Sequence, residues 1–523
     1  MILRALLALV FVGSLPHLAV GDTLADIRGR GELVWGADQE GGGPYVYPRD
    51  DDPSQVTGFE VEIAERLAAI LGVKARFVQG QWDKMPELLQ TRKVDIVLNG
   101  YEWTPARLTT MDATLPYFVY GLQLLARKDD DGLQNAGDLE KPSGRERKIG
   151  VLSGSAAESY AREHFEPGAE VIPYEGNTDT LREVETGKLD ATLEDTPIAV
   201  FYAPRFPRLR MIGPPVGHGY YVIYVRKGEA ALVTALDQAL IAMIRRGELE
   251  RIYRRWGLWS DRQHELARIA DAGRFFGLAG AVEAGGKMID DSSPLTLAAL
   301  QATERARGWE VVRRYGPILL QSAGVTVILS VLSFPLAIAA GLLIALGRLY
   351  GPAWLRPLLF SYVEFLRGTP LMLQLYFIFF FLPEIGINVP AFWTAIFGLA
   401  INYSAYESEI YRAGLQAIPP GQMEAALSLG MSRALALRRI VVPQAVRIVI
   451  PPVVNDFIAL FKDTSVCSVV TLVELTKRFS VLSQSTQATV ELMVLTAILY
   501  MAMSTPLTLL SRRLERRLGV TFA

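Results

Sequence analysis

Five apolar runs occupy the second half of the chain and constrain its fold more than any other feature. They lie near residues 317–346, 357–382, 391–411, 446–470 and 488–510. Each is long enough to cross a bilayer as a helix. Arginines follow the first, third and last runs, and arginine is enriched on the cytoplasmic side of membrane helices. The sequence therefore predicts an all-α membrane domain over residues 315–517, with about five spans that begin outside and finish inside.

Polar side chains interrupt these runs. Inside a membrane, such groups usually line a translocation path or a contact between helices, and the sequence leaves both roles open. They are Glu364, Arg367, Gln374, Asn402, Glu407 and Asn455.

A polar, arginine-rich insert at 419–445 separates the third and fourth runs. Two prolines and Gly421 cannot continue the preceding helix, so a new helix is expected from about Gln422. Gly430 interrupts it, and a second apolar stripe ends before Pro443. We expect two short amphipathic helices, joined at a glycine, on the cytoplasmic membrane surface.

The first half has a different pattern. From residue 22 to 261, short β-rich runs alternate with helical segments, and the same rhythm occurs twice, as in an α/β fold. Two extended apolar stretches, near 122–128 and 220–227, are alike in pattern but far apart in sequence. They predict two lobes joined by two hinge strands, a geometry that closes on a ligand.

The remaining segments and the composition indicate how the chain is organised and which kinds of partner it has. Residues 1–21 resemble a secretion signal peptide, and 262–314 suggest a tether followed by an amphipathic juxtamembrane helix. The net charge of −2 indicates no nucleic-acid partner, and the single cysteine, Cys467, cannot form an intramolecular disulfide. Because the sequence has no phosphate-binding G-x-x-x-x-G-K-[ST] motif, it predicts that ATP binds to a separate subunit.

Several motifs carry a resemblance to a known family. The string from Glu424 through Ala425 and Ala426 to Gly430, with Pro443 beyond, resembles the EAA loop of ABC-importer permeases. NDFIALFKDTS and RGTPLMLQ are similar to the polar amino-acid branch of those permeases. The resemblance implies that the EAA residues couple this chain to a separate ATPase subunit, with no cofactor in the chain itself. No catalytic residue or metal ligand is predicted.

The segment GFEVEIAERLAAIL and the closing GELERIYRRWGLW resemble periplasmic binding proteins for polar amino acids. This resemblance implies that Arg107 holds the ligand α-carboxylate, that Asp195 pairs with its α-ammonium, and that Asp38 reaches its amine or side chain. A guanidinium suits a carboxylate because two charge-assisted hydrogen bonds fit it. Other ligand residues are expected at Tyr45, Trp82, Gly100, Glu102 and Ser155.

Five of these positions have an alternative. Tyr45 and Trp82 could belong to the core of a lobe, Asp195 to a turn, and Ser155 to a helix N-cap. Glu102 stands where the family usually has threonine, and its charge favours a ligand with net positive charge or an additional amine. Alternatively, Glu102 turns away and pairs with a nearby arginine or lysine.

Together these features predict a receptor fused to a permease, which imports a polar amino acid across the inner membrane with the binding domain on the periplasmic side. The expected partners are the ATPase subunit, the amino acid, membrane lipid and a second copy of this chain. An amino-acid-gated channel or a ligand sensor on the same binding domain is the alternative function.

Overall fold

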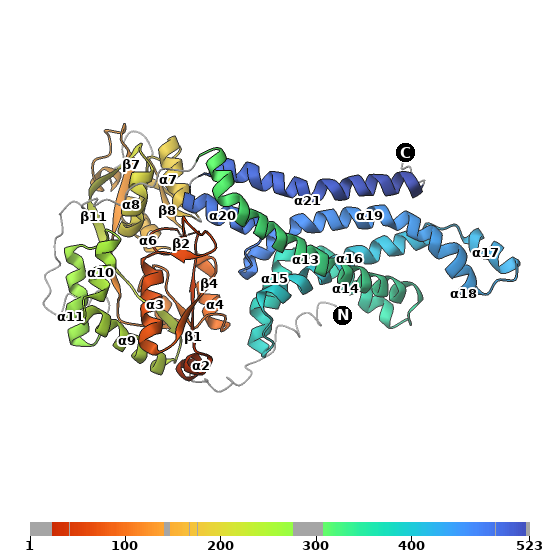
Figure 1. Ribbon diagram of the computed structural model, residues 1–523, viewed down its shortest axis with the longest axis horizontal. Coiled ribbons are helices and arrows are strands. Elements are labelled where there is room, and N and C mark those ends of the chain that lie inside the picture. Colours follow the sequence, from red (N-terminus) through yellow and green to blue (C-terminus); the bar gives the residue numbers. More distant parts are fainter. Residues whose placement is uncertain are drawn as a thin grey trace.

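The computed structural model describes residues 23–40, 42–140, 147–166, 168–174, 176–275, 307–486 and 488–518. An α/β domain fills one end of the molecule, and long helices extend from it side by side (Figure 1). This confirms the predicted fold class. The predicted signal peptide at 1–21 and most of the predicted tether lie outside the described residues.

Lobe 1 is built on a mixed sheet with the strand order β4-β1-β5-β12-β6. Helix α3 (Phe59–Leu71) shows why the sequence folds this way: Phe59, Ile63 and Leu67 recur at helical spacing and are fully buried. The strands are β1 (Glu32–Ala37), β4 (Lys74–Gln79), β5 (Ile96–Val97), β6 (Met111–Ala113) and β12 (Tyr224–Arg226), beside the small pair β2 (Tyr47–Pro48) and β3 (Val56–Thr57). The helices are α2 (Thr23–Arg30), α3 (Phe59–Leu71), η1 (Trp82–Lys84), α4 (Met85–Gln90), η2 (Arg107–Thr109), α9 (Ala230–Arg245) and α10 (Glu248–Arg255).

Lobe 2 has a second five-stranded sheet, in the order β11-β7-β10-β8-β9. The strands are β7 (Phe118–Arg127), β8 (Arg147–Leu152), β9 (Ala169–Tyr174), β10 (Ala191–Asp195) and β11 (Leu209–Tyr221). The helices are α5 (Gly137–Glu140), α6 (Ala156–Phe165), α7 (Asn177–Thr186), α8 (Thr196–Tyr202) and η3 (Ala203–Arg205).

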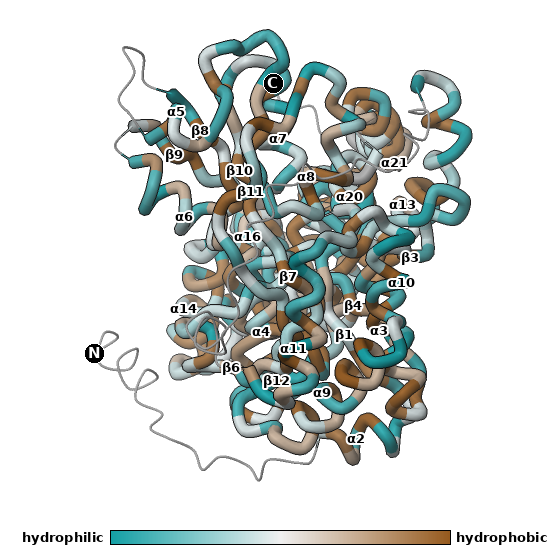
Figure 2. Tube along the Cα trace, turned by 90° about the vertical axis from the view of Figure 1, so that its left-hand side faces the viewer, coloured by the Kyte–Doolittle hydropathy of each residue, from teal (hydrophilic) through white to brown (hydrophobic). Residues whose placement is uncertain are grey.

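The chain crosses between the lobes twice, and the long strands β7 and β11 run beside each other toward the crossings (Figure 2). One crossing joins β6 to β7, between Ala113 and Phe118, and the other joins β11 to β12, between Tyr221 and Tyr224. The first lies earlier than the hinge expected near 122–128. Those residues form the interior of the lobe 2 sheet, where Leu122, Leu124 and Leu125 are buried.

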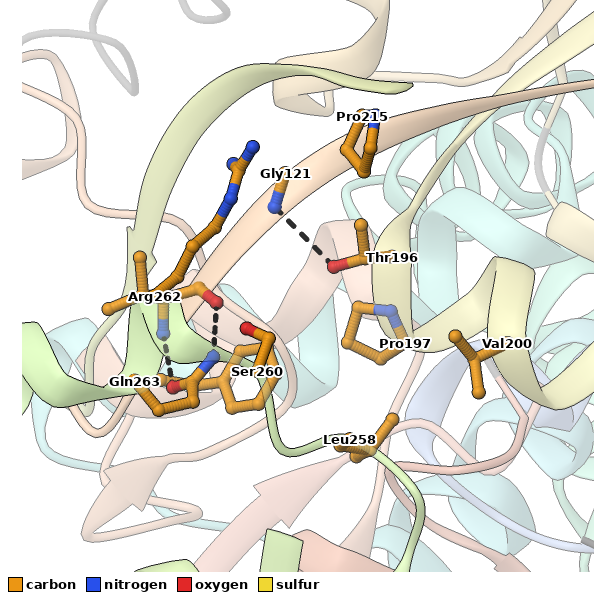
Figure 3. Close-up of a pocket in the computed structure, with 11 residues that line it drawn as sticks. Gly121, Thr196, Pro197, Val200, Pro215, Leu258, Ser260, Arg262 and Gln263 are labelled. Carbon is orange, nitrogen blue, oxygen red and sulfur yellow. Dashed lines mark hydrogen bonds between the residues drawn. The ribbon is translucent and has the colours of Figure 1, made fainter. Parts of the chain in front are cut away.

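A short segment after the last helix of the α/β domain holds the first hinge strand (Figure 3). The Gln263 side chain accepts a hydrogen bond from the Val119 amide at 3.1 Å and donates one to the Val119 carbonyl at 2.7 Å. Gln263 ends the short helix η4 (Asp261–Gln263), and α11 (His264–Ala272) follows it and buries Leu266 and Ile269. The segment from 262 to 272, expected to begin a tether, is therefore a packed part of the binding domain.

The second half is helical. The main helices are α13 (Trp309–Tyr350), α14 (Leu355–Gly368), α15 (Leu371–Tyr376), α16 (Ala391–Gln416), α17 (Pro420–Ser428), α18 (Arg433–Ala436), α19 (Val442–Asp463), α20 (Leu475–Thr486) and α21 (Thr489–Leu518). Short turns of other helix types are η5 (Phe377–Phe381), η6 (Leu382–Ile385), η7 (Leu437–Val441) and η8 (Thr464–Val470). From Trp309, the expected juxtamembrane helix is simply the start of α13.

Among the described residues, three helices are long and apolar enough to span a membrane, or four if one bent pair counts as a span. The bent pair differs from the continuous second span that we expected. Its two halves, Leu355–Gly368 and Leu371–Ile385, meet at an angle of 109°. The break falls at Pro370, whose ring cannot continue the incoming helix.

The third expected span, near 391–411, is helix α16, which has 26 residues and is long enough, but it is not among the helices apolar enough to span a membrane. Asn402, Ser404 and Glu407 on this helix are buried. A helix enclosed by its neighbours meets less lipid and can carry such groups.

The helical domain contacts both lobes. Lys477 on α20 pairs with Glu40 of lobe 1 at 2.7 Å. At the other end of the same region, Arg182 of lobe 2 donates a hydrogen bond to Thr489 at 2.9 Å. The membrane domain therefore holds the α/β domain across its cleft rather than by one lobe alone.

We predict that Gly341→Ala destabilises the helical domain. An added Cβ at Gly341 would lie 2.6 Å from the Glu407 Cβ and 3.0 Å from the Ser404 carbonyl, at the contact of α13 with α16. Such overpacking costs about 1–3 kcal/mol, so the thermal unfolding midpoint of the detergent-solubilised chain should fall.

Gly324→Ala is the matched control, because it lies on the same helix with nothing within 4 Å of the added Cβ. It should be neutral or stabilising, since alanine favours a helix over glycine. Equal unfolding midpoints for the two variants would contradict the close packing of α13 on α16.

Candidate functional site

A cavity of about 570 Å³, including its open mouth, lies between the two lobes. Seven of the eight predicted ligand residues line it: Asp38, Tyr45, Trp82, Gly100, Glu102, Ser155 and Asp195. The eighth, Arg107, is bonded to Glu102 and lies behind it. The structure thus brings together side chains that the sequence separates by more than 150 positions.

Two tyrosines connect one wall to the carboxylate of Asp195. The Tyr221 hydroxyl donates a hydrogen bond to Asp195, and the Tyr45 hydroxyl lies 2.7 Å from that of Tyr221. Tyr45 is 6% exposed, so it is a core residue that also faces the cavity. Gly100 permits this packing, because it has a φ of 62° and an added Cβ would lie 3.0 Å from the Tyr45 ring.

Asp38 organises the opposite wall. Its carboxylate accepts hydrogen bonds from the Trp82 amide at 2.9 Å and from the Gln79 side chain at 2.8 Å. Trp82 stacks on Tyr101 with ring centroids 4.7 Å apart. Asp38 therefore positions this aromatic wall in addition to bringing charge to the cavity.

The Arg107 guanidinium lies against these rings, 5.3 Å from the Trp82 centroid and 4.8 Å from that of Tyr101. It donates to a Glu102 carboxylate oxygen at 2.5 Å and to the Glu102 carbonyl at 2.8 Å. Glu102 is 2% exposed and still lines the cavity. Pairing with a nearby arginine, the alternative considered for Glu102, is therefore the arrangement observed.

Ser155 lies at the start of α6. Its hydroxyl accepts a hydrogen bond from the Glu158 amide at 3.2 Å and donates to the Leu152 carbonyl at 2.7 Å. It is thus a helix N-cap that also lines the cavity. The next amide, that of Ala156, donates at 3.0 Å to the second carboxylate oxygen of Glu102.

Sequence reasoning missed other lining residues, of which Glu194 matters most. The Glu194 carboxylate accepts hydrogen bonds from Thr180 at 2.5 Å and Thr192 at 2.7 Å. Neighbouring residues in a regular strand face opposite sides of the sheet. Asp195 ends β10, and the chain turns there, which lets both acids line the cavity. Asn99 and Asn177 were also missed.

The cavity has an excess of negative charge. Four carboxylates line it, those of Asp38, Glu102, Glu194 and Asp195, and no lysine or arginine does so among the described residues. Burial raises the pKa of Asp38 to about 6 and that of Glu194 to about 7. Burial and the nearby Glu102 carboxylate raise the pKa of Asp195 well above its usual value. The described lining of the cavity therefore supplies four carboxylates and no positively charged side chain.

At the far end of the helical domain, α17 and α18 form the predicted elbow (Figure 1). Gly430 has a φ of 80° between them. Glu424, Ala425, Gly430 and Pro443 are exposed, whereas Ala426 packs inward with 4% exposure.

One detail of the elbow differs from expectation. The second helix does not stop before Pro443, because α18, η7 and α19 form one continuous helical path from Arg433 to Val470. The π-helical turn η7 comes immediately before the first turn of α19, which holds Pro443. A widened turn accommodates a residue that has no N–H to donate.

Comparison with known proteins gives a family for each half. Residues 33–258 match the model of bacterial extracellular solute-binding proteins, family 3. Residues 337–520 match that of the binding-protein-dependent transport system inner membrane component. The binding fold also has a similar solved structure, the ancestral amino acid-binding protein AncCDT-1, with 33% identity, coverage of 45% of this chain and 99% of that chain, and a TM-score of 0.41.

Curated relatives match the membrane half. The chain is 34% identical to the L-cystine transport system permease protein TcyB of Bacillus subtilis, over 40% of this chain and 91% of the relative. It is 32% identical to the glutamine transport system permease protein GlnP of Escherichia coli K12, over 40% of this chain and 98% of the relative. It is 31% identical to the B. subtilis arginine permease ArtQ, over 39% of this chain and 93% of the relative. This chain therefore belongs to the inner-membrane permeases of amino-acid ABC importers, with a family 3 solute-binding domain fused in front of the permease.

Proposed function

We propose that this chain is the receptor-plus-permease subunit of an ATP-driven importer with a preference for cationic amino acids. One observation carries the proposal: the acidic cleft belongs to the α/β domain at one end of the molecule, and the exposed elbow lies at the opposite end, beyond the helical domain (Figure 1). Ligand captured on one side of the membrane and a motor bound on the other side require this arrangement.

The charges of the cleft support the cationic preference. Arg107 is the group to hold an α-carboxylate, and Asp195 the group to hold an α-ammonium. Asp38 and Glu194 then remain, and a positively charged side chain would neutralise them. The relatives carry cystine, glutamine and arginine in their names, so their names do not select a ligand.

The elbow supports coupling to a separate ATPase subunit, which would bind the ATP. Three leucines on it are exposed although they are apolar: Leu427 at 40%, Leu429 at 83% and Leu435 at 44%. Such a patch beside arginines suits a protein partner at the cytoplasmic surface. Two copies of the chain, paired about a twofold axis within the lipid, would present two elbows to two ATPase subunits.

Uptake measurements separate this function from the alternatives. The full chain, reconstituted in proteoliposomes with an amino-acid ABC ATPase subunit, should accumulate labelled arginine only with ATP, and arginine should stimulate ATP hydrolysis. A gated channel would equilibrate arginine without ATP, and a sensor would bind it without moving it. Either result would refute the proposal.

The raised pKa values predict how ligand affinity depends on pH. Asp38 and Glu194 take up protons as the pH falls through about 6 and about 7, so the cleft loses negative charge. The affinity of the full chain for arginine should fall about tenfold more than that for glutamine between pH 8 and pH 5, since a pKa unit corresponds to about 1.4 kcal/mol. Titration calorimetry with both ligands measures the ratio.

The variant Asp38→Asn removes one of the two titrating groups and should flatten this pH dependence. An arginine-to-glutamine affinity ratio that stays constant or rises toward pH 5 would contradict the assignment of these carboxylates to a cationic ligand. Tight glutamate binding at neutral pH would contradict it as well.

The elbow generates a separate prediction. Glu424→Arg should reduce arginine-stimulated ATP hydrolysis by about tenfold, because it reverses a charge on the exposed coupling surface. Arginine affinity should not change, since the cleft is at the other end of the molecule (Figure 1). Glu384→Arg is the matched control, because it makes the same exchange on an exposed residue of η6. Equal stimulation in the two variants would refute the coupling role of Glu424.

A further inference from the structure

Glu102 joins the two lobes across the cleft. One carboxylate oxygen accepts a hydrogen bond from Arg107 of lobe 1 at 2.5 Å, and the other accepts one from the Ala156 amide of lobe 2 at 3.0 Å. Arg107 also reaches lobe 2 itself, with its second nitrogen 3.4 Å from the Gly154 carbonyl. A single buried carboxylate thus satisfies a guanidinium and a helix N-terminus at the same time.

These two partners are what a ligand carboxylate needs. A guanidinium binds a carboxylate through charge-assisted hydrogen bonds, and free amides at the start of a helix favour an anion. The proposed function assigns the α-carboxylate of the amino acid to Arg107, and Glu102 stands between Arg107 and the cavity. The place of the ligand carboxylate is therefore filled by the protein's own side chain.

We propose that Glu102 is a specificity-determining residue, a built-in surrogate for the ligand carboxylate that an incoming amino acid must displace. This inference rests on the proposed function. Displacement has a consequence that depends on the ligand. The freed Glu102 carboxylate stays in a cavity that three other carboxylates line, and no lysine or arginine lines it among the described residues.

A buried charge without a partner is costly, so the ligand must bring a cation to Glu102. Arginine and lysine carry a second positive group and can do so, whereas glutamine and glutamate cannot. Glu102 thereby makes the cleft selective for cationic amino acids. The two expectations for this residue, pairing with an arginine and selecting a positive ligand, are then compatible, because an incoming carboxylate would exchange the first for the second.

The decisive experiment removes the charge of Glu102 and keeps its shape. Affinities for arginine, glutamine and agmatine, which is arginine without its carboxylate, are measured by calorimetry on the full chain in nanodiscs. In Glu102→Gln, the side chain at position 102 competes less well with the ligand carboxylate for Arg107. The affinity for glutamine should therefore rise about tenfold, and the ratio of arginine affinity to glutamine affinity should fall by at least that factor. Agmatine affinity should not rise, because agmatine has no carboxylate to place.

Glu170→Gln is the matched control, since this β9 glutamate is 47% exposed and pairs with Lys148 on the surface. It should leave all three affinities unchanged. A second variant, Glu102→Thr, tests whether the effect survives loss of the longer side chain. Hydrogen exchange gives an independent readout: the Ala156 amide, bonded to Glu102 in the empty cleft, should exchange faster in both Glu102 variants than in the parent.

Two results would overturn the inference. One is a glutamine affinity and an arginine preference that stay within twofold of the parent in both Glu102 variants, with the fold intact by thermal unfolding. The other is a loss of all three ligands, which would make Glu102 a direct ligand group. The proposed function fails by a different result, the absence of ATP-dependent arginine uptake by the parent chain, so the two failures are distinguishable.

Discussion

Charges withdrawn from water need partners, and this constraint determines how the cleft is built. Four carboxylates face a single cavity, and the nearest guanidinium, that of Arg107, is already bonded to one of them. Asp38 is satisfied by loop amides, Glu194 by two threonine hydroxyls and Asp195 by Tyr221. Hydrogen bonds from neutral donors relieve these carboxylates only in part, as the raised pKa values of Asp38 and Glu194 show. The protein lobes supply the shape of the site and leave part of its positive charge to the ligand.

The same constraint operates where the two domains meet. Lys477 is only 4% exposed, and its partner Glu40 lies two residues after Asp38. The Glu40 amide in turn donates to the Asp38 carboxylate at 2.9 Å. A cation of the permease is therefore placed against the loop that forms one wall of the ligand cleft. Fusion of the two domains in one chain favours such a contact, because the tethered domain is always present at a high local concentration.

The fold of the binding domain could be predicted from the sequence more fully than the course of the membrane helices. The apolar residues of α3 recur at the spacing of one helix face, so the sequence predicts this helix. Arg107 and Asp195 occupy positions that match a family motif. Glu194 was missed because strand alternation says nothing about the last residue before a turn. The pairing of Glu102 with the Ala156 amide joins two lobes, and local patterns carry no information about that distance. The second span was expected to be continuous, but the chain bends at Pro370. The second helix of the elbow was expected to end before Pro443, but a π-helical turn continues the helical path past that residue.

That continuity gives the elbow a direct physical connection to the receptor. The helical path from Arg433 to Val470 has 38 residues, about 57 Å at 1.5 Å per residue, which exceeds the roughly 30 Å core of a bilayer. It starts at the elbow and ends beside α20, whose Lys477 pairs with lobe 1. Thr489, the first residue of α21, accepts a hydrogen bond from Arg182 of lobe 2. Consecutive helical segments therefore connect the elbow to contacts with both lobes, and the cleft lies between those lobes. A second helix ending at Pro443 would have interrupted this path between the elbow and the binding domain.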